Sequence, residues 1–403
     1  MGIRAQAVIG ALYGDEGKGL MVDRLAAATP GAVVVRSNGG AQAGHTVVAP
    51  DGARHVFHHV SSGSFAGAAT HFSRFFVAHP MLLLDELAAL EARGVTPRLT
   101  SDPRAVVTTP FDVMLNQAVE LARGTGRHGS CGLGFGETIE RNLHPEFSLV
   151  TQDLFRPDLG ERLAHIRDAW VPARLAALGI DRLPHELAAA LADEATIRRF
   201  HADCAAYLDR VALWPDRRLG ELGPILFEAA QGLLLDQDFG AFPHVTRSKT
   251  GLANMLAIAR EAGITALDAT YVTRCYTTRH GAGPLAGETP TLEGIRVVDL
   301  TNAPNDWQGI LRLAPLDLGV LRAAIASDLA AERGGVAVEA GLAVTCLDQA
   351  EGAFFAFDGG DLVRLHPATA AEHIADAAKL PLWSESWGPR REDERKVEDV
   401  AVA

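Results

Sequence analysis

Short apolar runs recur along the chain, bounded by glycine or polar residues. Residues 33–35 are a continuous run of this kind, and 106–107 is a shorter one. Residues 3–11 are predicted to form a buried strand around the apolar run 7–10. Such runs are typical of strands that are buried on both faces of a parallel sheet. Later strand candidates are residues 225–227, 269–275 and 342–346.

Amphipathic segments lie between these runs. Residues 18–28, 82–93 and 111–123 have apolar positions at helical spacing, with Glu86 and Glu91 expected on the exposed face of the second. Strands that alternate with helices predict an α/β fold, with a central, mainly parallel sheet flanked by helices.

Two later regions interrupt the alternation. Residues from about 155 to 222 are rich in Ala, Leu, Arg and Asp, which predicts a helical insertion subdomain. Residues 300–318 contain Asn, Pro, Asp and Gly and predict a loop. Because no repeat or Gly/Ser linker is found, we predict one catalytic domain over residues 1–403.

Composition narrows the classes of partner. Hydrophobic residues make up 48% of the 403 positions, enough for a large core. The formal net charge of −13 argues against a nucleic-acid partner, because phosphate backbones favour a basic surface. The four cysteines form no C-x-x-C pair, so a reduced, cytoplasmic protein without a zinc site is expected. No stretch is long and apolar enough to span a membrane, so no membrane partner is expected.

The stretch YGDEGKG, residues 13–19, lies between an apolar run and a helical segment. A glycine-rich turn at a helix N-terminus presents backbone N–H groups to an anion, and Lys18 adds a full charge. The stretch differs from a P-loop, since six residues separate Gly10 from the Gly-Lys pair and Gly19 stands where a Ser or Thr would hold magnesium. Asp15 is then the nearest candidate ligand for Mg²⁺, which would offset its repulsion from phosphate. The alternative is an ordinary tight turn that caps the helix.

Two further glycine-rich stretches contain polar side chains. NGGAQAGHT, residues 38–46, places His45 just after an apolar run, where active-site loops of open sheets lie. We interpret His45 as a catalytic candidate, with a structural histidine as the alternative. HGSCGLGFGET, residues 128–138, contains Ser130 and Cys131 and predicts a second phosphate site or, alternatively, a surface loop. Nothing in the sequence places a base beside Cys131, so a nucleophilic role has little support.

Two later stretches have the same character. EAAQGLLLDQDFGAFPHVTRS, residues 228–248, contains Gln231 and Thr246 beside apolar positions. YTTRHGAGP, residues 276–284, places Arg279 before a glycine-rich turn, where it could clamp a carboxylate or phosphate. Both stretches are also compatible with plain loop structure.

Together these stretches resemble the motifs of the adenylosuccinate synthetase family, whose members join aspartate to IMP with GTP. The family's GDEGKGK resembles residues 14–20, RxQGGxNAGHT resembles 36–46, and GTTGRGIGP resembles 129–137. EGAQGxxLDxxxGxYPxVTSS resembles 228–248, and YxTRVGxGPFPTE resembles 276–288. Weaker likenesses are PSG at 61–63, KLD at 346–348 and SxGPxR at 386–391. The resemblance covers nearly the whole chain in the right order and implies the adenylosuccinate synthetase fold.

The resemblance implies a role for each matching residue. Asp15 would remove the N1 proton of the acceptor base, and His45 would be the acid in the transfer of the γ-phosphoryl group of GTP to O6. Asp15 and the Gly44 carbonyl would hold Mg²⁺, with GTP, or alternatively ATP, as co-substrate. The residues implied to bind the nucleotide phosphates are Glu16, Gly17, Lys18, Gly19 and Thr46. Those implied for the acceptor nucleotide are Asn38, Gln42, Ser130, Cys131, Gln231, Thr246 and Arg279, and those for guanine are Asp348, Ser386, Gly388 and Pro389. The family also implies a homodimer in which an arginine, here Arg141, reaches the acceptor nucleotide of the partner subunit.

Several positions depart from the family's motifs. The aspartate-binding loop TTTGRxRRxGWLD aligns with residues 301–317, where one arginine, Arg312, is left and Asn305 is a second candidate contact for the amine substrate. Cys346 replaces the lysine of KLD. These departures indicate a divergent paralogue of the housekeeping enzyme. Phage 2-aminoadenylosuccinate synthetases, which use dGMP, are one candidate for its relatives, although they replace the base aspartate that is kept here as Asp15.

We therefore predict a GTP-dependent C–N ligase of the adenylosuccinate synthetase type, acting on IMP or an analogue and on L-aspartate in purine biosynthesis. The alternatives are a paralogue with a different acceptor, such as dGMP, or a different amine donor, and a nucleotide-binding regulator without catalysis. The intact set of Asp15, Lys18 and His45 argues against the regulator, and Gly19 argues against a P-loop kinase.

Overall fold

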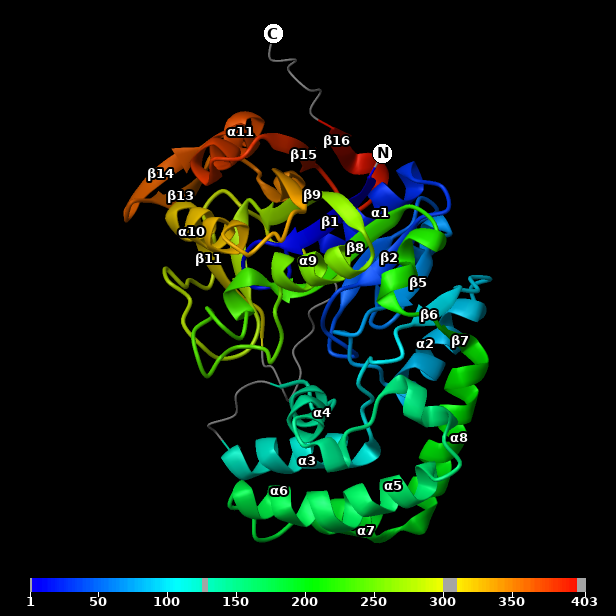
Figure 1. Cartoon of the computed structure of the whole chain (residues 1–403). Coiled ribbons are helices and arrows are strands. Elements are labelled where there is room, and N and C mark those ends of the chain that lie inside the picture. Colours follow the sequence, from blue (N-terminus) through cyan, green and yellow to red (C-terminus); the bar gives the residue numbers. More distant parts are fainter. Residues whose placement is uncertain (1, 125–129, 300–309, 397–403) are drawn as a thin grey trace.

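The computed structural model describes residues 2–124, 130–299 and 310–396. Within this part, ten strands form one sheet in the order β16-β15-β12-β9-β1-β8-β2-β5-β6-β7 (Figure 1). The pairings are parallel, except that the edge strand β16 runs antiparallel to β15. The strands are β1 (Ile3–Gly10), β2 (Val33–Arg36), β5 (Ala69–Phe72), β6 (Leu99–Ser101), β7 (Val211–Leu213), β8 (Ile225–Gly232), β9 (Ile264–Arg274), β12 (Ala337–Thr345), β15 (Leu382–Ser386) and β16 (Glu394–Lys396).

Two smaller sheets flank the large one. The first has the order β10-β11-β13-β14, and the second is the hairpin of β3 and β4. Their strands are β3 (His45–Val48), β4 (Arg54–Phe57), β10 (Tyr276–Arg279), β11 (Arg312–Asp317), β13 (Phe354–Asp358) and β14 (Asp361–Leu365). The hairpin matters for function because its first residue is His45.

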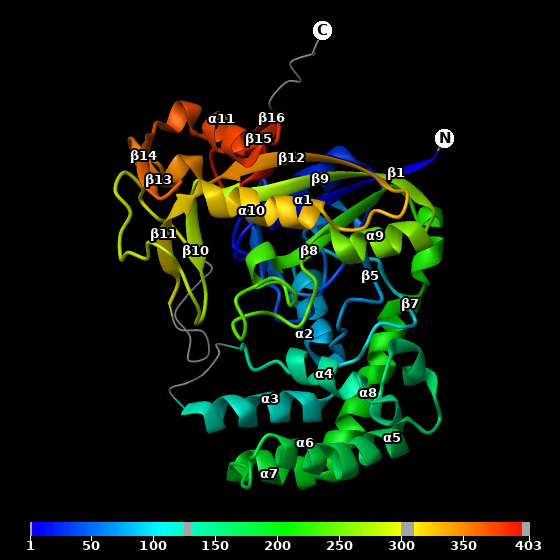
Figure 2. The same cartoon turned by 60° about the vertical axis from the view of Figure 1, so that its left-hand side comes forward.

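The helices form two groups. One group packs on the large sheet, with α1 against β1 and β8, α9 against β9, and α11 against β12 and β15. The other group, α3 to α8, gathers below the sheet in both views (Figures 1 and 2). The helices are α1 (Lys18–Ala28), α2 (Pro80–Glu91), α3 (Pro110–Arg123), α4 (Phe135–Asn142), α5 (Leu159–His165), α6 (Val171–Ala177), α7 (His185–Ala192), α8 (Glu194–Arg210), α9 (Leu252–Glu261), α10 (Leu318–Leu329) and α11 (Pro367–Ala378). Shorter turns are Ser62–Ala66 (η1), Pro145–Phe147, Thr151–Phe155, Ile166–Trp170, Asp216–Glu221, Leu233–Leu235, Leu347–Gln349 (η8) and Arg391–Asp393.

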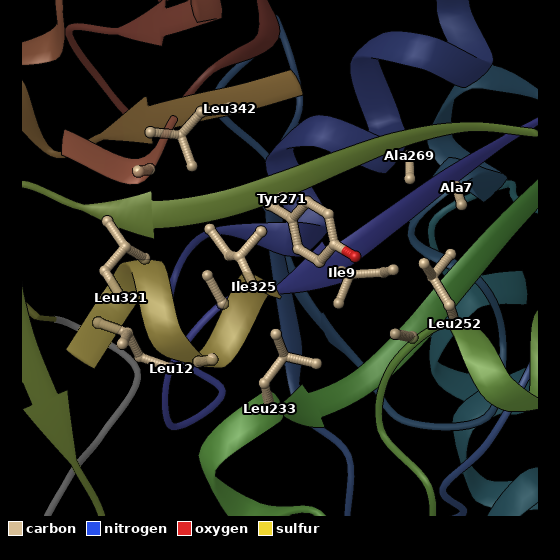
Figure 3. Packing of buried hydrophobic residues seen from close by; sticks show 14 of the residues in the cluster. Ala7, Ile9, Leu12, Leu233, Leu252, Ala269, Tyr271, Leu321, Ile325 and Leu342 are labelled. Atoms are coloured by element: carbon tan, nitrogen blue, oxygen red, sulfur yellow. The ribbon is translucent and has the colours of Figure 1, made fainter. Parts of the chain in front are cut away.

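The strand β1 lies at the centre of the largest apolar cluster. Ile9 of β1 packs with Tyr271 of β9, Leu252 of α9 and Ile325 of α10 (Figure 3). Helices therefore cover a strand whose second half, Ala7–Ile9, is apolar and buried on both faces, as expected for the interior of a parallel sheet. None of the described helices is both long and apolar enough to cross a bilayer.

The predicted α/β fold with a mainly parallel sheet is confirmed. The helix expected at 18–28 has these bounds, and the strands expected near 3–11, 33–35, 225–227, 269–275 and 342–346 are all present. Two expectations are wrong. Residues 106–107 form only isolated bridges, to Val150 and Ala78, because they pair with single residues rather than with a neighbouring strand. The loop expected over 300–318 contains β11, whose residues pair with β10 and β13 in a separate sheet.

Glu86 of α2 was expected on an exposed face, which is wrong, since the residue is only 6% exposed. Its carboxylate accepts the main-chain N–H groups of His58 at 2.8 Å and His59 at 2.7 Å, in the turn that follows β4. Burial opposes the ionisation of Glu86, but bonds from His55, His59 and the His58 main chain outweigh burial and hold its pKa well below the usual range. Helical spacing could not show this, because the partners lie on another element.

The histidine before α2 gives a prediction for stability. His79 accepts the Leu82 N–H at 3.4 Å as the N-cap of α2, and burial lowers the pKa of its imidazole to about 3. Below pH 6.5 the unfolded chain takes up a proton here that the folded chain cannot, so stability is lost as the pH falls. His79→Asn keeps a capping acceptor and removes the titrating group.

We expect His79→Asn to be about 1–2 kcal/mol less stable than the wild type at pH 7.5, because part of the ring volume is left empty. Between pH 6.5 and 5 the wild type should lose about 2 kcal/mol relative to the variant, since each pH unit contributes about 1.4 kcal/mol for such a group. Urea unfolding at pH 6.5 and at pH 5 measures the difference in unfolding free energy between the wild type and the variant. A difference that stays constant or widens at pH 5 would contradict a neutral, buried His79.

Candidate active site

A cavity lies at the carboxyl ends of the central parallel strands, where open α/β sheets bind their ligands. The loop between β1 and α1 forms one wall, the start of β3 forms another, and the last residue of β9 contributes a third side. Its lining consists of Gly14, Asp15, Gly17, Lys18, Gly19, Gly44, His45, Thr46, Arg274 and Asp299. The structure therefore brings together the predicted catalytic, metal and phosphate residues, with Glu16 directly behind the lining.

The predicted phosphate loop is held by an internal ion pair. Lys18 and Glu16 are 1% and 3% exposed, and Lys18 Nζ lies 3.1 Å from Glu16 Oε2 and 2.6 Å from the Gly14 carbonyl. Glu16 Oε1 accepts the N–H groups of Leu12 at 3.0 Å and Gly14 at 2.7 Å. Glu16 thus shapes the loop from inside, and the anion-binding surface consists of backbone N–H groups at the N-terminus of α1 and the charge of Lys18.

Gly19 explains why the loop lacks the Ser or Thr of a P-loop. A Cβ at this position would lie 2.7 Å from the Thr46 carbonyl and 3.3 Å from the Cβ of His45. The first turn of α1 and the start of β3 therefore approach each other so closely that no side chain fits. This contact sets the position of His45 relative to the phosphate loop.

We expect Gly19→Ala to lower kcat about a hundredfold, because a shift of His45 by a fraction of an ångström misaligns the reacting groups. Overpacking should also cost about 1–3 kcal/mol of stability. Steady-state assays and thermal unfolding measure the two effects. Gly160→Ala is the matched control, since a Cβ there meets no atom within 4 Å. Wild-type kcat in Gly19→Ala would show that the contact does not position His45.

Asp15 stands where the loop meets the open part of the cavity. Its Oδ2 lies 3.7 Å from Nε2 of His280, and its carbonyl accepts the Nε–H of Arg274. Neither ring nitrogen of His280 has a hydrogen-bond partner among the described residues. Burial raises the pKa of the Asp15 carboxyl, and the charges of His280 and Arg274 oppose that rise. A carboxylate with a raised pKa is a stronger base than an ordinary aspartate.

His45 is oriented by a buried carboxylate. Its Nδ1 lies 2.6 Å from Oε1 of Glu228, which also accepts bonds from the hydroxyl and the N–H of Ser62. Burial lowers the pKa of His45 to about 4, although Glu228 favours the charged form. The neutral ring therefore donates its Nδ1 proton to Glu228, and Nε2 carries a lone pair.

Glu228 remains ionised despite full burial. Burial alone would raise the pKa of Glu228. The charge of Arg36 has the largest opposing effect, followed by His45 and Ser62, and together they lower the pKa to about 2. Arg36 also donates to the carbonyls of His59 and Val60, in the turn held by Glu86. Glu228 and Ser62 lie within stretches that resemble family motifs, but no role was predicted for either residue. The available signal was a single acid within a run of apolar residues in β8.

The residues at this cavity fit a Mg²⁺ ion that is held mainly by its substrate. Asp15 offers a carboxylate and Gly44 a carbonyl, and both line the cavity. Among the described residues, no group of three or more His, Cys, Asp or Glu side chains is arranged to hold a metal. Mg²⁺ commonly binds one or two carboxylates together with waters and substrate phosphates, so a protein cage is not required.

Of the residues predicted to bind the acceptor nucleotide, Gln42 and Gln231 have side-chain atoms that are free to form hydrogen bonds with a ligand, within the described part of the chain. Both amide atoms of Gln42 and Oε1 of Gln231 are buried without a hydrogen-bond partner in the described part of the chain. Gln231 also has a φ of 64°, a left-handed conformation that non-glycine residues rarely adopt and that concentrates at functional sites. Asn38 differs, since its amide exchanges two hydrogen bonds with the main chain of Ala230.

The remaining residues predicted to bind the acceptor nucleotide are not part of the lining of this cavity. Ser130 accepts a bond from Asn116 of α3 at 2.9 Å, and burial raises the pKa of the Cys131 thiol to about 11, which argues against a nucleophile. Thr246 belongs to the loop after β8, whose Arg247 pairs with Glu140 of α4. That pair joins the loop after β8 to the helical group.

Two predicted arginines are engaged within the subunit. Arg279 is 1% exposed and donates to the Pro284 and His244 carbonyls, with its guanidinium 4.5 Å from the Tyr13 ring centroid. Arg141 is fully buried, where it forms a two-pronged pair with Asp112 and donates to two carbonyls of its own chain. These bonds hold the guanidinium within its own subunit, opposite a buried acid of α3. The contact expected between Arg141 and the partner's nucleotide stays a prediction.

The predicted amine-binding residues are described only in part, because Asn305 lies outside the described residues. Arg312 is present on β11, where it pairs with Glu288 and donates to the carbonyls of Gly281 at 3.0 Å and Gly283 at 2.9 Å. Its charge therefore supports the glycine turn after β10.

The predicted guanine-binding residues lie close together. Asp348 is exposed on η8, which packs against β15, the strand that ends at Ser386. Ser386 donates its hydroxyl to the Gly388 carbonyl at 2.8 Å, and Pro389 follows on the surface. Cys346 precedes η8 with a φ of 61°.

The chain is similar in sequence to proteins of one family. The family model for adenylosuccinate synthetase matches residues 7–308. The adenylosuccinate synthetase of Chromohalobacter salexigens is 36% identical over 293 residues, which cover 70% of this chain and 64% of that protein. That of Bordetella petrii is 35% identical over 300 residues, with 73% and 67% covered. The chain thus matches less than two thirds of the first of these relatives.

Two solved structures share the fold at low sequence identity. The fully ligated adenylosuccinate synthetase from Plasmodium falciparum superposes with a TM-score of 0.72 at 17% identity, covering 98% of this chain and 100% of that one. Cyanophage S-2L succinoaminodeoxyadenylate synthetase (PurZ), bound to dGMP and dATP as an energy donor, superposes with a TM-score of 0.60 at 18% identity, covering 98% and 96%.

Proposed function

Because the chain belongs to the adenylosuccinate synthetase family, we propose that it is a nucleoside-triphosphate-dependent ligase that forms a C–N bond on a 6-oxopurine nucleotide. GTP is the preferred energy donor and L-aspartate the amine donor in this proposal. The observation that carries it is the meeting of Asp15, Lys18 and His45 around one cavity beside a phosphate loop.

The chemistry follows from these three residues. Asp15 accepts the proton from N1 of the acceptor base, so that electron density moves to O6 and O6 attacks the terminal phosphorus. The nucleoside diphosphate leaves, and O6 now carries a phosphoryl group, so that it can depart later as phosphate. The amine then attacks C6, and phosphate departs with the former O6. Positioning and charge stabilisation supply most of the acceleration in such phosphoryl transfers.

His45 and Lys18 act on the charge that develops. Lys18 and the N-terminus of α1 face the phosphates, and the buried ion pair with Glu16 keeps them in place. The Nε2 atom of His45 gains a proton when phosphates raise its pKa, and it then donates to the transferring group. Asp15 and the Gly44 carbonyl would hold a Mg²⁺ ion, which would neutralise phosphate charge.

A second acceptor has a specific observation in its favour. The phage structure with this fold contains dGMP and uses dATP as its energy donor. The lysine of the family's KLD motif, next to the predicted guanine site, is Cys346 here. The alternative proposal is therefore a ligase with dGMP as acceptor or ATP as donor. We also expect a homodimer, which sedimentation analysis tests.

A panel assay tests both proposals. Phosphate release is measured with GTP or ATP, with IMP, GMP or dGMP, and with or without L-aspartate. The proposal predicts release that requires one acceptor and one amine together. Nucleotide binding without release under any combination would contradict a ligase and favour a regulator.

A further inference from the structure

The cavity contains a cation that no motif points to. Lys18 lines the cavity, but Glu16 balances part of its charge, because the ammonium bonds both the Gly14 carbonyl and the Glu16 carboxylate. His45 is buried, and its Nδ1 lies 2.6 Å from Oε1 of Glu228. A nucleoside triphosphate nevertheless brings several negative charges to this place. Arg274, the last residue of β9, is the other cationic side chain that lines the cavity in the described part of the chain.

Arg274 is held firmly at the wall of the cavity. Its side chain is 12% exposed, its Nε–H is donated to the Asp15 carbonyl, and Nη1 donates to the Tyr276 hydroxyl at 2.9 Å. Nη2 lies 3.3 Å from a carboxylate oxygen of Asp299. These contacts use three of the five N–H groups of the guanidinium. The group is therefore oriented in advance and keeps donors for a ligand.

Arg274 also lies beside a position where the family's motif has a cation. Cys346 replaces the lysine of KLD, and it follows the residue of β12 that pairs with Arg274. Burial raises the pKa of the Cys346 thiol, and the charge of Arg274 opposes that rise, which places the two groups close together. The positive charge missing at position 346 is thus present nearby, but on a side chain that reaches the phosphate cavity.

We propose that Arg274 binds the terminal phosphoryl group of the nucleoside triphosphate and, through the same guanidinium, fixes the main chain of Asp15. This inference rests on the proposed function for the identity of the ligand. A planar guanidinium suits this task because its paired N–H groups match two phosphate oxygens. Since charge on the equatorial oxygens changes during transfer, Arg274 should contribute both to triphosphate binding and to kcat.

The test compares Arg274→Gln and Arg274→Lys with the wild type. Calorimetry measures the affinity for guanosine 5′-(β,γ-imido)triphosphate and for GDP, each with Mg²⁺. Arg322→Gln, an exposed arginine on α10, is the matched control. Arg274→Gln should weaken triphosphate binding roughly ten- to a hundredfold, the size expected for lost charge-assisted hydrogen bonds, and change GDP binding less than about twofold. Arg274→Lys should recover part of the loss, and the control should match the wild type.

Several outcomes overturn the proposal. Equal losses for GDP and the triphosphate would mean that Arg274 only supports the Asp15 loop. Unchanged triphosphate affinity, or a wild type that does not prefer the triphosphate, would exclude a contact with the terminal phosphate. The ligase proposal can fail separately. If the wild type binds the triphosphate selectively through Arg274 but releases no phosphate with any acceptor and amine, only the ligase proposal is contradicted.

Discussion

Asp15→Asn is expected to reduce phosphate release by about a thousandfold, within the range for loss of a general base. Asparagine has nearly the same shape as aspartate but cannot accept a proton from N1, so O6 stays a poor nucleophile. The affinity for the nucleotide should change much less, because the phosphate loop is held by Glu16 and Lys18. Single-turnover assays at saturating substrates measure the rate, and calorimetry measures binding.

The control for this variant is Asp361→Asn, which changes an exposed aspartate on β14 in the same way. It should retain the wild-type rate. If Asp15→Asn turned over at a rate close to the wild type, Asp15 would not be the base, whatever its place in the cavity.

His45→Asn is expected to lower kcat by about a hundred- to a thousandfold while the protein remains folded. The change removes the Nε2 group that donates to the phosphoryl oxygen, and it leaves the Glu228 carboxylate with an amide partner at best. Glu228→Gln should produce a smaller loss of about tenfold or more, because the ring keeps its chemistry but the charged acceptor that orients it becomes a neutral amide. The exposed variant His373→Asn, on α11, is the control.

A proton should accompany nucleotide binding. Because the free imidazole is neutral near pH 7 and bound phosphates raise its pKa, the wild type should take up a proton with the triphosphate, and His45→Asn should take up less. Calorimetry in buffers of different ionisation enthalpy measures this uptake. Equal uptake by both proteins would show that His45 is not the group that titrates.

The sequence allowed the sheet and the centre of the site to be predicted for a physical reason. A buried parallel strand requires an apolar run, and a phosphate loop requires glycines at a helix start, so β1, α1 and Asp15 follow from local pattern. His45 followed in the same way, as a polar side chain in a loop of small residues after β2.

What could not be predicted depends on partners far apart in the chain. Glu228 is 183 residues from His45 in sequence, and a lone acid in a strand does not name its partner. Arg274 likewise ends an apolar strand and meets Asp15 only in the folded chain. The ion pair of Arg141 with the buried carboxylate of Asp112 could not be predicted either, because the two residues lie on different helices.

The most direct test follows the oxygen atom that the proposed chemistry converts into a leaving group. The acceptor that supports turnover is prepared with ¹⁸O at position 6, and the released phosphate is analysed by mass spectrometry. If Asp15 and His45 together drive phosphorylation of O6, each turnover transfers the label to phosphate. Phosphate that is released without the label would contradict that claim.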